Sequence, residues 1–539
     1  MPREAVRRVP GARSVVRRPY LADMSSSNRL GDAVGTGGDG SRDRLTILAG
    51  TGQNVIGLGV FVIASFGMNI LIAQAFGKGS AAFGQITVAT QLAFVVGAAT
   101  RFGMDMAAVR RVAIEVGQAT GGRIRAIVRI AVMIALVVSA IVGVIAFVFA
   151  APLASLMGAP TGAYRAAAIA LVFVAIAQVY LGGSRGMKIM RHTLYAYWIG
   201  QSISWIAFTL VAWAVWSRSV AVTVFAYAAS WVFATAVAWF FWHKESGRFR
   251  PAMPAAPGET QALIRYGAPR APAALLSQAL FYTDLFVLSI QLPKGDPDLS
   301  VYAACVRVSQ ALVLFLTAAS YMFSPFVADL HERGEHDRLN SLFKSVTRWT
   351  LALTVPLLLL FMIAPAQILR LFGSEYDAGT AWLRILLIGQ TVNVSVGAAG
   401  FVLIMVGRTT WDLFVYASSF VLDLAIALLL IPHLGPTGAA IAQSTTLVFS
   451  NTLRLYLVWR FVHIQPYDRD YARILIPTAV GALAMLGIHS MLDGPKWALD
   501  LLGTGLVGGL VYYTAFLLVG LTPTEKGAVM RVLNRGRAA

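Results

Sequence analysis

Three arginines interrupt apolar stretches of the sequence, near the end of each stretch that is predicted to face the cytoplasm. They are Arg101, Arg270 and Arg454. A charged group inside a membrane segment is costly, so each arginine marks a candidate functional site. The planar guanidinium group donates bidentate hydrogen bonds to phosphate, which makes anion binding the chemistry that these residues favour. The alternative is that they extend to the phosphates of membrane lipids, as arginines near helix ends do.

A second set of ionisable residues lies in the outer halves of apolar segments. Asp284, Arg307 and Asp423 are each about 10 Å deep, counted at 1.5 Å per helical residue. Asp284 and Arg307 are expected to meet as an ion pair, with Asp423 at a similar depth. One interpretation is a structural salt bridge. The other is that the two carboxylates bind or release a coupling proton or sodium ion while Arg307 responds to their charge.

The sequence contains no motif for disulfide formation, metal binding or nucleotide binding. Cys305 is the only cysteine and the seven histidines are scattered singly, which excludes disulfides and cysteine-rich metal sites. No nucleotide-binding motif occurs, so direct ATP drive is not expected. We therefore predict a protein that is not an enzyme, with no metal site and no cofactor beyond a coupling H+ or Na+.

The composition predicts an all-α polytopic membrane protein. Of its 539 residues, 57% are hydrophobic and only 13% are charged, far from the roughly 25% charge of soluble domains. A helix needs about 20 apolar residues to cross a bilayer. Fourteen segments meet that need, approximately 46–72, 83–104, 127–150, 163–183, 193–216, 220–242, 263–291, 300–325, 346–364, 381–406, 410–431, 435–462, 471–491 and 497–520.

The positions of the basic residues predict the topology. The net charge of +19 comes from 44 Lys and Arg residues, most of which fall in the tail and in alternate loops. Such loops face the cytoplasm, so both termini are expected there, in the inner membrane. The positive charge then follows topology and predicts no nucleic-acid partner. The loops on the opposite side are short, which weakens the hypothesis of a polymerase or glycosyltransferase with an external catalytic domain.

The chain repeats itself weakly. Residues 83–109 align with 301–327, and Ala151-Pro152 before Gly158 recurs as Ala364-Pro365 before Gly373. Six helices per half is an even number, so the repeat is parallel and predicts two lobes around a central cavity. The expected domains are a disordered basic tail (1–44), an N-lobe (45–242), a cytoplasmic linker (243–262), a C-lobe (263–462) and two further helices with the C-terminus (463–539).

Matching positions of the two lobes predict moving parts. The first helix contains Gly50, Gly52, Gly57 and Gly59, and the seventh contains Gly267, Pro269 and Pro272. Interrupted helices at corresponding positions are typical of hinges or binding elements in transporters, although small residues also serve helix packing. Arg185 and Arg408 fall in the corresponding inner turns of the lobes, where they either close a cytoplasmic gate or only enforce topology.

Several short motifs resemble the polysaccharide flippase family of the multidrug/oligosaccharidyl-lipid/polysaccharide exporter superfamily. The resemblance spans about residues 45–520. The motifs are Phe76-Gly77-Lys78 with Phe83-Gly84, Arg185-Gly186, Tyr282-Thr283-Asp284, and Leu371-Phe372-Gly373 through Tyr376 to Val406-Gly407-Arg408.

The resemblance implies a function in the synthesis of cell-surface polysaccharide. It implies transfer of a polyprenyl-diphosphate-linked oligosaccharide to the outer leaflet by alternating access. The charge and the inner position of the three arginines fit the diphosphate of such a lipid. Membrane lipids are expected partners, and a polysaccharide polymerase or glycosyltransferases are candidate partners. Two alternatives share this fold: an efflux antiporter for small molecules, and a lipid II flippase, although the first helix lacks the arginine usual in that branch. A scaffold that recruits partners through the Arg-rich tail is a further alternative.

Overall fold

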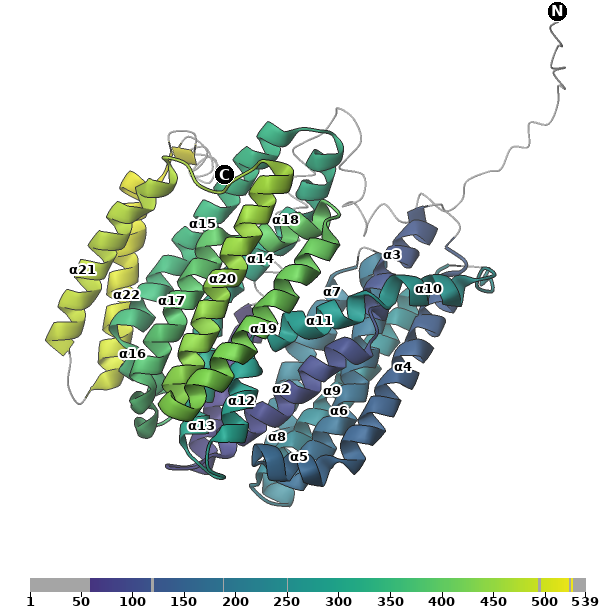
Figure 1. Ribbon diagram of the computed structural model, residues 1–539, viewed down its shortest axis with the longest axis horizontal. Coiled ribbons are helices and arrows are strands. Elements are labelled where there is room, and N and C mark those ends of the chain that lie inside the picture. Colours follow the sequence, from purple (N-terminus) through teal and green to yellow (C-terminus); the bar gives the residue numbers. More distant parts are fainter. Residues whose placement is uncertain are drawn as a thin grey trace, which may run out of the picture. The chain divides into compact units, whose positions relative to one another are not determined.

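The structure is a computed structural model, and it describes residues 59–117, 121–187, 189–249, 251–492, 496–522 and 525–526. The predicted tail and the glycines at positions 50, 52 and 57 lie outside these residues. The described part is nearly all helical and contains no β-strand, as predicted, and we describe its helices as two groups, the first lobe and the second lobe (Figure 1). We call the end that is predicted to face the cytoplasm the inner end, and the opposite end the outer end.

The first lobe is built around one central helix, α6. Its helices are Gly59–Phe76, α2 (Ala82–Thr100), α3 (Met104–Gly117), α4 (Ile124–Val148), α5 (Ala150–Met157), α6 (Thr161–Gly186), α7 (Arg191–Thr193), the π-helix η2 (Leu194–Gln201), α8 (Ser202–Val215) and α9 (Val220–Ser246). Helix α6 packs against α2, α3, α4 and α9. Small residues permit this close approach: a Cβ atom at Gly186 would lie 2.7 Å from Val112 Cβ.

The second lobe follows the same plan. Its helices are α10 (Glu259–Gly267), α11 (Arg270–Ala279), α12 (Thr283–Gln291), α13 (Asp298–Gln310), α14 (Val313–Glu332), α15 (His336–Ile363), α16 (Pro365–Leu369), the 3-10 helix η3 (Ser374–Gly379), α17 (Thr380–Val396), α18 (Ala399–Met405), α19 (Thr409–Leu434) and α20 (Pro436–Val462). The repeat predicted around Gly158 and Gly373 is visible here: α4 with α5, and α15 with α16, are both a long helix followed by a short one.

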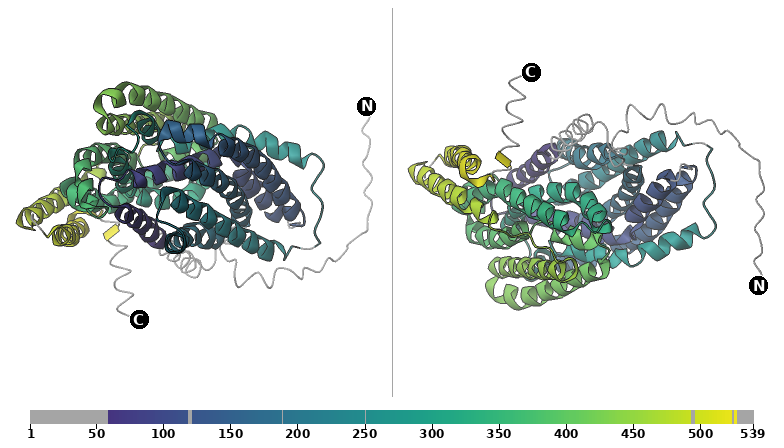
Figure 2. Two further views of the ribbon diagram at one scale, coloured as in Figure 1. Left: turned by 90° about the horizontal axis from the view of Figure 1, so that it is seen from below. Right: turned by 90° about the horizontal axis from the view of Figure 1, so that it is seen from above.

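A helical hairpin completes the described chain. It contains the 3-10 helix η4 (Tyr471–Ile474), α21 (Leu475–Leu492), α22 (Trp497–Ala515) and the π-helix η5 (Phe516–Gly520). The hairpin packs on α15, at the edge of the second lobe (Figures 1 and 2). Its outward residues, such as Leu483 and Leu506, are large, apolar and exposed, as expected of a surface that faces lipid.

The described residues contain ten helices long and apolar enough to cross a membrane, or twelve if each of two bent pairs is one span. These correspond to twelve of the fourteen predicted segments. Of the other two, segment 300–325 corresponds to α13 and the first part of α14, and segment 435–462 corresponds to α20. Polar residues such as Arg307 and Arg454 lower the hydropathy of these helices, and many of their side chains are buried against neighbouring helices.

The seventh predicted segment is discontinuous, as expected, but its sharpest bend is not at the prolines. Helices α10 and α11 break at Ala268–Pro269, whereas the 63° bend lies between Ala279 and Thr283. A bent helix leaves backbone groups unpaired inside the membrane. Here Gln443 Nε2 donates a hydrogen bond of 3.2 Å to the Phe281 carbonyl, so a neighbouring helix stabilises the bend.

Candidate functional site

The C-lobe brings two of the three predicted inner arginines toward one carboxylate. Arg270 begins α11, Arg454 lies in α20, and both interact electrostatically with Asp412 in the first turn of α19. Arg454 Nε is 3.9 Å from Asp412 Oδ1, and the guanidinium carbon lies 4.5 Å from the centre of the Tyr416 ring. We call Arg270, Arg454, Asp412 and Tyr416 the inner cluster.

The hydrogen-bonding capacity of the inner cluster is largely unused. Arg454 is 8% exposed, and its Nε and Nη2 atoms have no hydrogen-bond partner among the described residues. Asp412 Oδ1 is also buried and lacks a described partner. Buried polar groups are normally hydrogen-bonded. The cluster can therefore accept a ligand with acceptor oxygens, such as a phosphate, without first breaking short hydrogen bonds at these atoms.

The third predicted arginine, Arg101, belongs to the N-lobe and lies near the break between α10 and α11. Its guanidinium group is 3.6 Å from Asp105, and its buried Nε atom lacks a described partner. Gly103 follows in the left-handed conformation (φ 66°), and a Cβ atom there would lie 3.0 Å from Arg270 Cβ. Arg101 thus lies close in the chain to a residue that packs on Arg270, but the structure records no bond that joins it to the inner cluster.

The three predicted outer residues lie in one region, yet the expected ion pair is not formed. No salt bridge joins Asp284 to Arg307 in the part of the chain that is described. Tyr302 instead donates a hydrogen bond to Asp284 Oδ2, and Arg307 Nη1 donates one of 3.4 Å to the Tyr282 hydroxyl. The reason is that α12 begins after the bend, which places the Asp284 side chain in the interior against α13, α19 and α20.

Two buried carboxylates meet behind this bend. Asp284 and Asp423 are both fully buried and interact electrostatically with each other. Thr446 donates a hydrogen bond of 3.2 Å to Asp423 Oδ1, while Asp284 Oδ1 and Asp423 Oδ2 lack described partners. We call Asp284, Asp423, Tyr302 and Thr446 the acidic pair site. Its oxygen atoms suit a proton or a hard cation such as sodium, because two buried negative charges need compensation.

The four residues predicted as gate or hinge belong to neither the inner cluster nor the acidic pair site. Arg185 is half-buried within the last turn of α6, and Arg408 is exposed before α19, with its guanidinium carbon 4.9 Å from the centre of the Phe461 ring. Pro269 and Pro272 are exposed at the start of α11. The gate and hinge roles of these four residues stay predictions.

Sequence reasoning missed four members of these sites: Asp412, Tyr416, Tyr302 and Thr446. Asp412 falls four residues after Arg408 at the start of a predicted span, where an acidic residue resembles an ordinary surface charge. Its burial depends on packing that brings α19 beside α20 and α11. The hydroxyls of Tyr302 and Thr446 carry no charge, so hydropathy does not reveal them. The motif Tyr282-Thr283-Asp284 was the available signal for the region.

Hydrogen bonds join the two lobes directly at the outer end. The backbone N–H of Gly84 in α2 donates a hydrogen bond of 3.0 Å to Ser300 Oγ, which itself donates one of 2.8 Å to the Ser80 carbonyl. Gln74 Nε2 donates one of 2.8 Å to the Leu371 carbonyl. At the inner end, α11 lies between α2 of one lobe and α19 of the other. We call Gln74, Ser80, Gly84, Ser300 and Leu371 the outer contact.

Comparison with known proteins gives a family and a fold. The family model described as polysaccharide biosynthesis protein matches residues 48–331, and the MatE model matches 269–429. No curated protein sequence matches the chain. These matches agree with the all-helical, multi-pass architecture.

Solved structures of low sequence identity share the fold. The lipid II flippase MurJ in an inward closed conformation is 13% identical, with a TM-score of 0.65 over 86% of this chain and 97% of that chain. A multidrug resistance MATE family transporter of the MOP superfamily, inward-facing, is 15% identical, with a TM-score of 0.58 over 75% and 94%. A MOP superfamily transporter from Pyrococcus furiosus is 14% identical, with a TM-score of 0.55 over 76% and 95%.

Proposed function

Because the chain belongs to the polysaccharide biosynthesis protein family, we propose that it is a flippase for polyprenyl-diphosphate-linked oligosaccharide. It moves this lipid from the cytoplasmic to the outer leaflet of the inner membrane, with both of its own termini in the cytoplasm. Membrane lipids surround it, and a polysaccharide polymerase or glycosyltransferases act before or after it. The protein breaks no covalent bond of its substrate.

The inner cluster carries this proposal. A diphosphate offers several anionic acceptor oxygens, and Arg454 holds two buried donor atoms without described partners. Guanidinium groups bind phosphate bidentately, so Arg454 and Arg270 together match a diphosphate in the sign of charge and in the kind of donor. Asp412 has a second role: it compensates the two arginines when no substrate is bound, which lowers the cost of burying their charge.

Binding and release must alternate between the two sides of the membrane. The outer contact joins the lobes at the outer end, while α11, which carries Arg270 of the inner cluster, packs on the N-lobe at the inner end. Movement of α11 admits the headgroup, and rupture of the outer contact releases it. These are two arrangements of packed elements, as alternating access requires.

The acidic pair site supplies the coupling. A proton or sodium ion that enters between Asp284 and Asp423 relieves their repulsion and compensates their buried charge. The site adjoins the bend between α11 and α12. Occupation of the site therefore changes the stability of the same discontinuous helix that begins with Arg270.

The proposal is tested in a strain that lacks the gene and is complemented with variants. Arg454→Ala removes the charged donors, and hydrogen bonds to charged groups are worth about 1.5–3 kcal/mol, so we expect transfer to fall about ten- to a hundredfold. The measurement is leaflet-resolved labelling of lipid-linked oligosaccharide followed by mass spectrometry. Arg460→Ala is the matched control, because Arg460 is exposed near the end of the same helix.

Two results would overturn the proposal. Full delivery to the outer leaflet by Arg454→Ala, at normal protein level, would remove the inner cluster from substrate binding. Unchanged lipid-linked oligosaccharide in the gene-deleted strain, together with altered sensitivity to cationic compounds, would favour an efflux antiporter. The match to the MatE model over 269–429 and the buried acidic pair are the observations that keep this second candidate. Accumulated lipid II would instead identify a lipid II flippase.

A further inference from the structure

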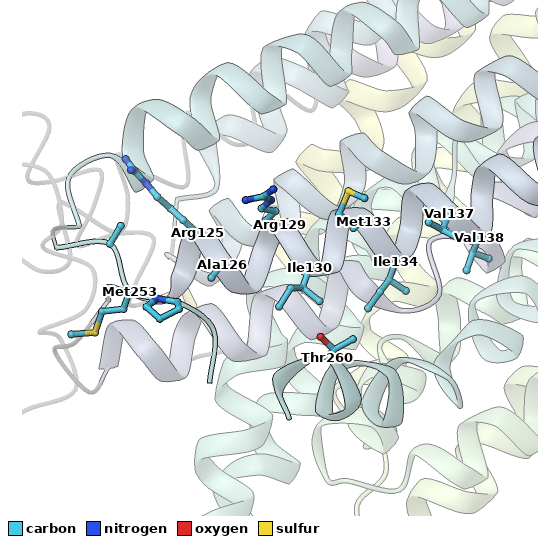
Figure 3. Close-up of a pocket in the computed structure, with 12 residues that line it drawn as sticks. Arg125, Ala126, Arg129, Ile130, Met133, Ile134, Val137, Val138, Met253 and Thr260 are labelled. Atoms are coloured by element: carbon cyan, nitrogen blue, oxygen red, sulfur yellow. The ribbon is translucent and has the colours of Figure 1, made fainter. Parts of the chain in front are cut away.

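A groove of about 850 Å3 lies on the N-lobe, outside both sites described above (Figure 3). One face of α4 forms its floor, from Arg125 to Val138. The segment that joins the lobes, at Met253 and Pro254, and Thr260 of α10 line the rest. We call this feature the α4 groove.

The α4 groove is basic at one end and apolar along the rest. Arg125 and Arg129 lie in the first two turns of α4, and Met133, Ile134 and Val137 continue the same face (Figure 3). Val138 is thirteen positions after Arg125, which corresponds to about 20 Å along a helix. Half of a bilayer's hydrocarbon core is about 15 Å thick, so the groove runs from headgroup level through one leaflet.

The groove is built by close backbone contacts rather than left by loose packing. The Met253 N–H donates a hydrogen bond of 2.9 Å to the Gly122 carbonyl. A Cβ atom at Gly122 would lie 2.7 Å from the Pro251 carbonyl oxygen, so the glycine permits the joining segment to approach the start of α4. This contact holds the segment beside the basic end of the groove.

The positive charge of the groove is not compensated within the described chain. Arg125 Nε donates a hydrogen bond of 3.1 Å to the Ser246 carbonyl, which directs the guanidinium group but adds no negative charge. No carboxylate among the described residues forms an ion pair with Arg125 or Arg129. Met133 and Val137, each 51% exposed, extend the groove as an open apolar surface.

We propose that the α4 groove binds an anionic phospholipid of the inner leaflet. Its phosphate lies between Arg125 and Arg129, and one acyl chain follows Met133 to Val138. Basic pockets at the cytoplasmic end of membrane helices recognise anionic headgroups in this way. Because the joining segment and α10 line the same groove, the bound lipid stabilises their position on the N-lobe. The lipid is thus a ligand distinct from the transported substrate.

Native mass spectrometry of the purified full-length protein tests this inference. The probe is phosphatidylglycerol, with phosphatidylcholine as the neutral comparison. We expect retained phosphatidylglycerol on the unchanged protein and at least a tenfold loss of affinity in Arg125→Gln/Arg129→Gln. Arg123→Gln is the matched control, because Arg123 is exposed at the same helix end but does not line the groove. It is expected to retain the lipid.

A second variant tests the apolar part of the groove independently of its positive charge. Met133→Trp fills the apolar part of the groove and leaves both arginines, so we expect it to lose the bound lipid as well. Equal retention of phosphatidylglycerol and phosphatidylcholine, or equal retention by the control, the double variant and Met133→Trp, would overturn the inference and indicate only surrounding bulk lipid. The readout is binding and not transport, so its failure leaves the proposed flippase function untouched.

Discussion

At the scale of single residues, two sets of buried ionisable groups have hydrogen-bonding atoms without described partners. Arg454 is buried with unused donors, beside a carboxylate 3.9 Å away. Asp284 and Asp423 are buried with unused acceptor oxygens. Unsatisfied groups of this kind destabilise a folded protein and persist where a ligand uses them. The basic set favours an anion, and the acidic set favours a cation.

The acidic pair site leads to a prediction about coupling. Asp284→Asn keeps the side-chain volume but removes one of two interacting charges, so we expect transport to lose its dependence on an imposed H+ or Na+ gradient. The measurement is substrate transfer in proteoliposomes with each gradient applied in turn.

A matched control is available in the C-terminal hairpin. Asp500 is equally buried but is held by His489 Nδ1 at 2.9 Å, far along the chain from the acidic pair site. Asp500→Asn is expected to keep the gradient dependence even if it lowers thermal stability. Gradient dependence that survives in Asp284→Asn would remove this site from the coupling mechanism.

At the scale of elements, the discontinuous seventh segment connects the sites. Helix α11 starts at Arg270 of the inner cluster, and α12 starts one residue before Asp284 of the acidic pair site. Helix α10 is held on α3 of the N-lobe by Arg111 and Glu259, whose Nε–Oε1 distance is 2.7 Å. This hydrogen bond raises the pKa of Arg111. The three short helices therefore join the lobes.

We predict that Glu259→Ala releases α10 from α3. The Glu259 side chain is buried and receives charged hydrogen bonds from Arg111, so the expected loss of unfolding free energy is about 1.5–3 kcal/mol. Thermal unfolding in detergent measures it. Glu335→Ala is the control: Glu335 pairs with Arg338 on the surface, where such pairs contribute less than about 1 kcal/mol. Equal losses in the two variants would show that the α3–α10 contact does not stabilise the lobe junction.

At the scale of the whole described molecule, the outer contact joins the two lobes through hydrogen bonds to backbone groups. Helix α2 approaches α13 so closely that a Cβ atom at Gly84 would lie 2.7 Å from the backbone carbon of Leu299. A glycine is needed there because the contact is between backbones. The outer contact is therefore sensitive to one added side chain.

We predict that Gly84→Leu shifts the protein toward an outward-open arrangement. The buried Phe372, which packs on Phe83 at this end, provides the readout. In a Cys305→Ala background, a cysteine at position 372 should react with a membrane-impermeant thiol reagent several-fold faster when Gly84→Leu is present. Gly487→Leu is the control, because a Cβ atom there would meet no atom within 4 Å. Unchanged labelling would mean that this contact does not hold the outer end closed.

The helical architecture follows from the sequence to a large extent. Apolar runs predict helices because the membrane interior leaves the backbone no other means of satisfying its polar groups. The segment from Ala82 to Thr100, for example, is a single helix near its predicted limits. The sharpest bend lies near Tyr282 and not at the prolines from which a bend was predicted. The Gln443 side chain stabilises the bend at this position by its hydrogen bond to the Phe281 carbonyl. Such stabilisation depends on a residue distant in the chain.

The candidate sites also contain some residues that the sequence predicts and others that only the structure identifies. Arg270, Arg454, Asp284 and Asp423 could be selected from the sequence alone, because a charge inside an apolar segment is costly wherever its helix packs. Their partners could not. Asp412 interacts with two arginines because α19 packs on both α11 and α20. Tyr302 bonds to Asp284 in place of Arg307 because α12 packs on α13. The sequence determined which residues carry charge into the membrane, whereas tertiary packing decided which of them meet, since those contacts join segments that are far apart in the chain.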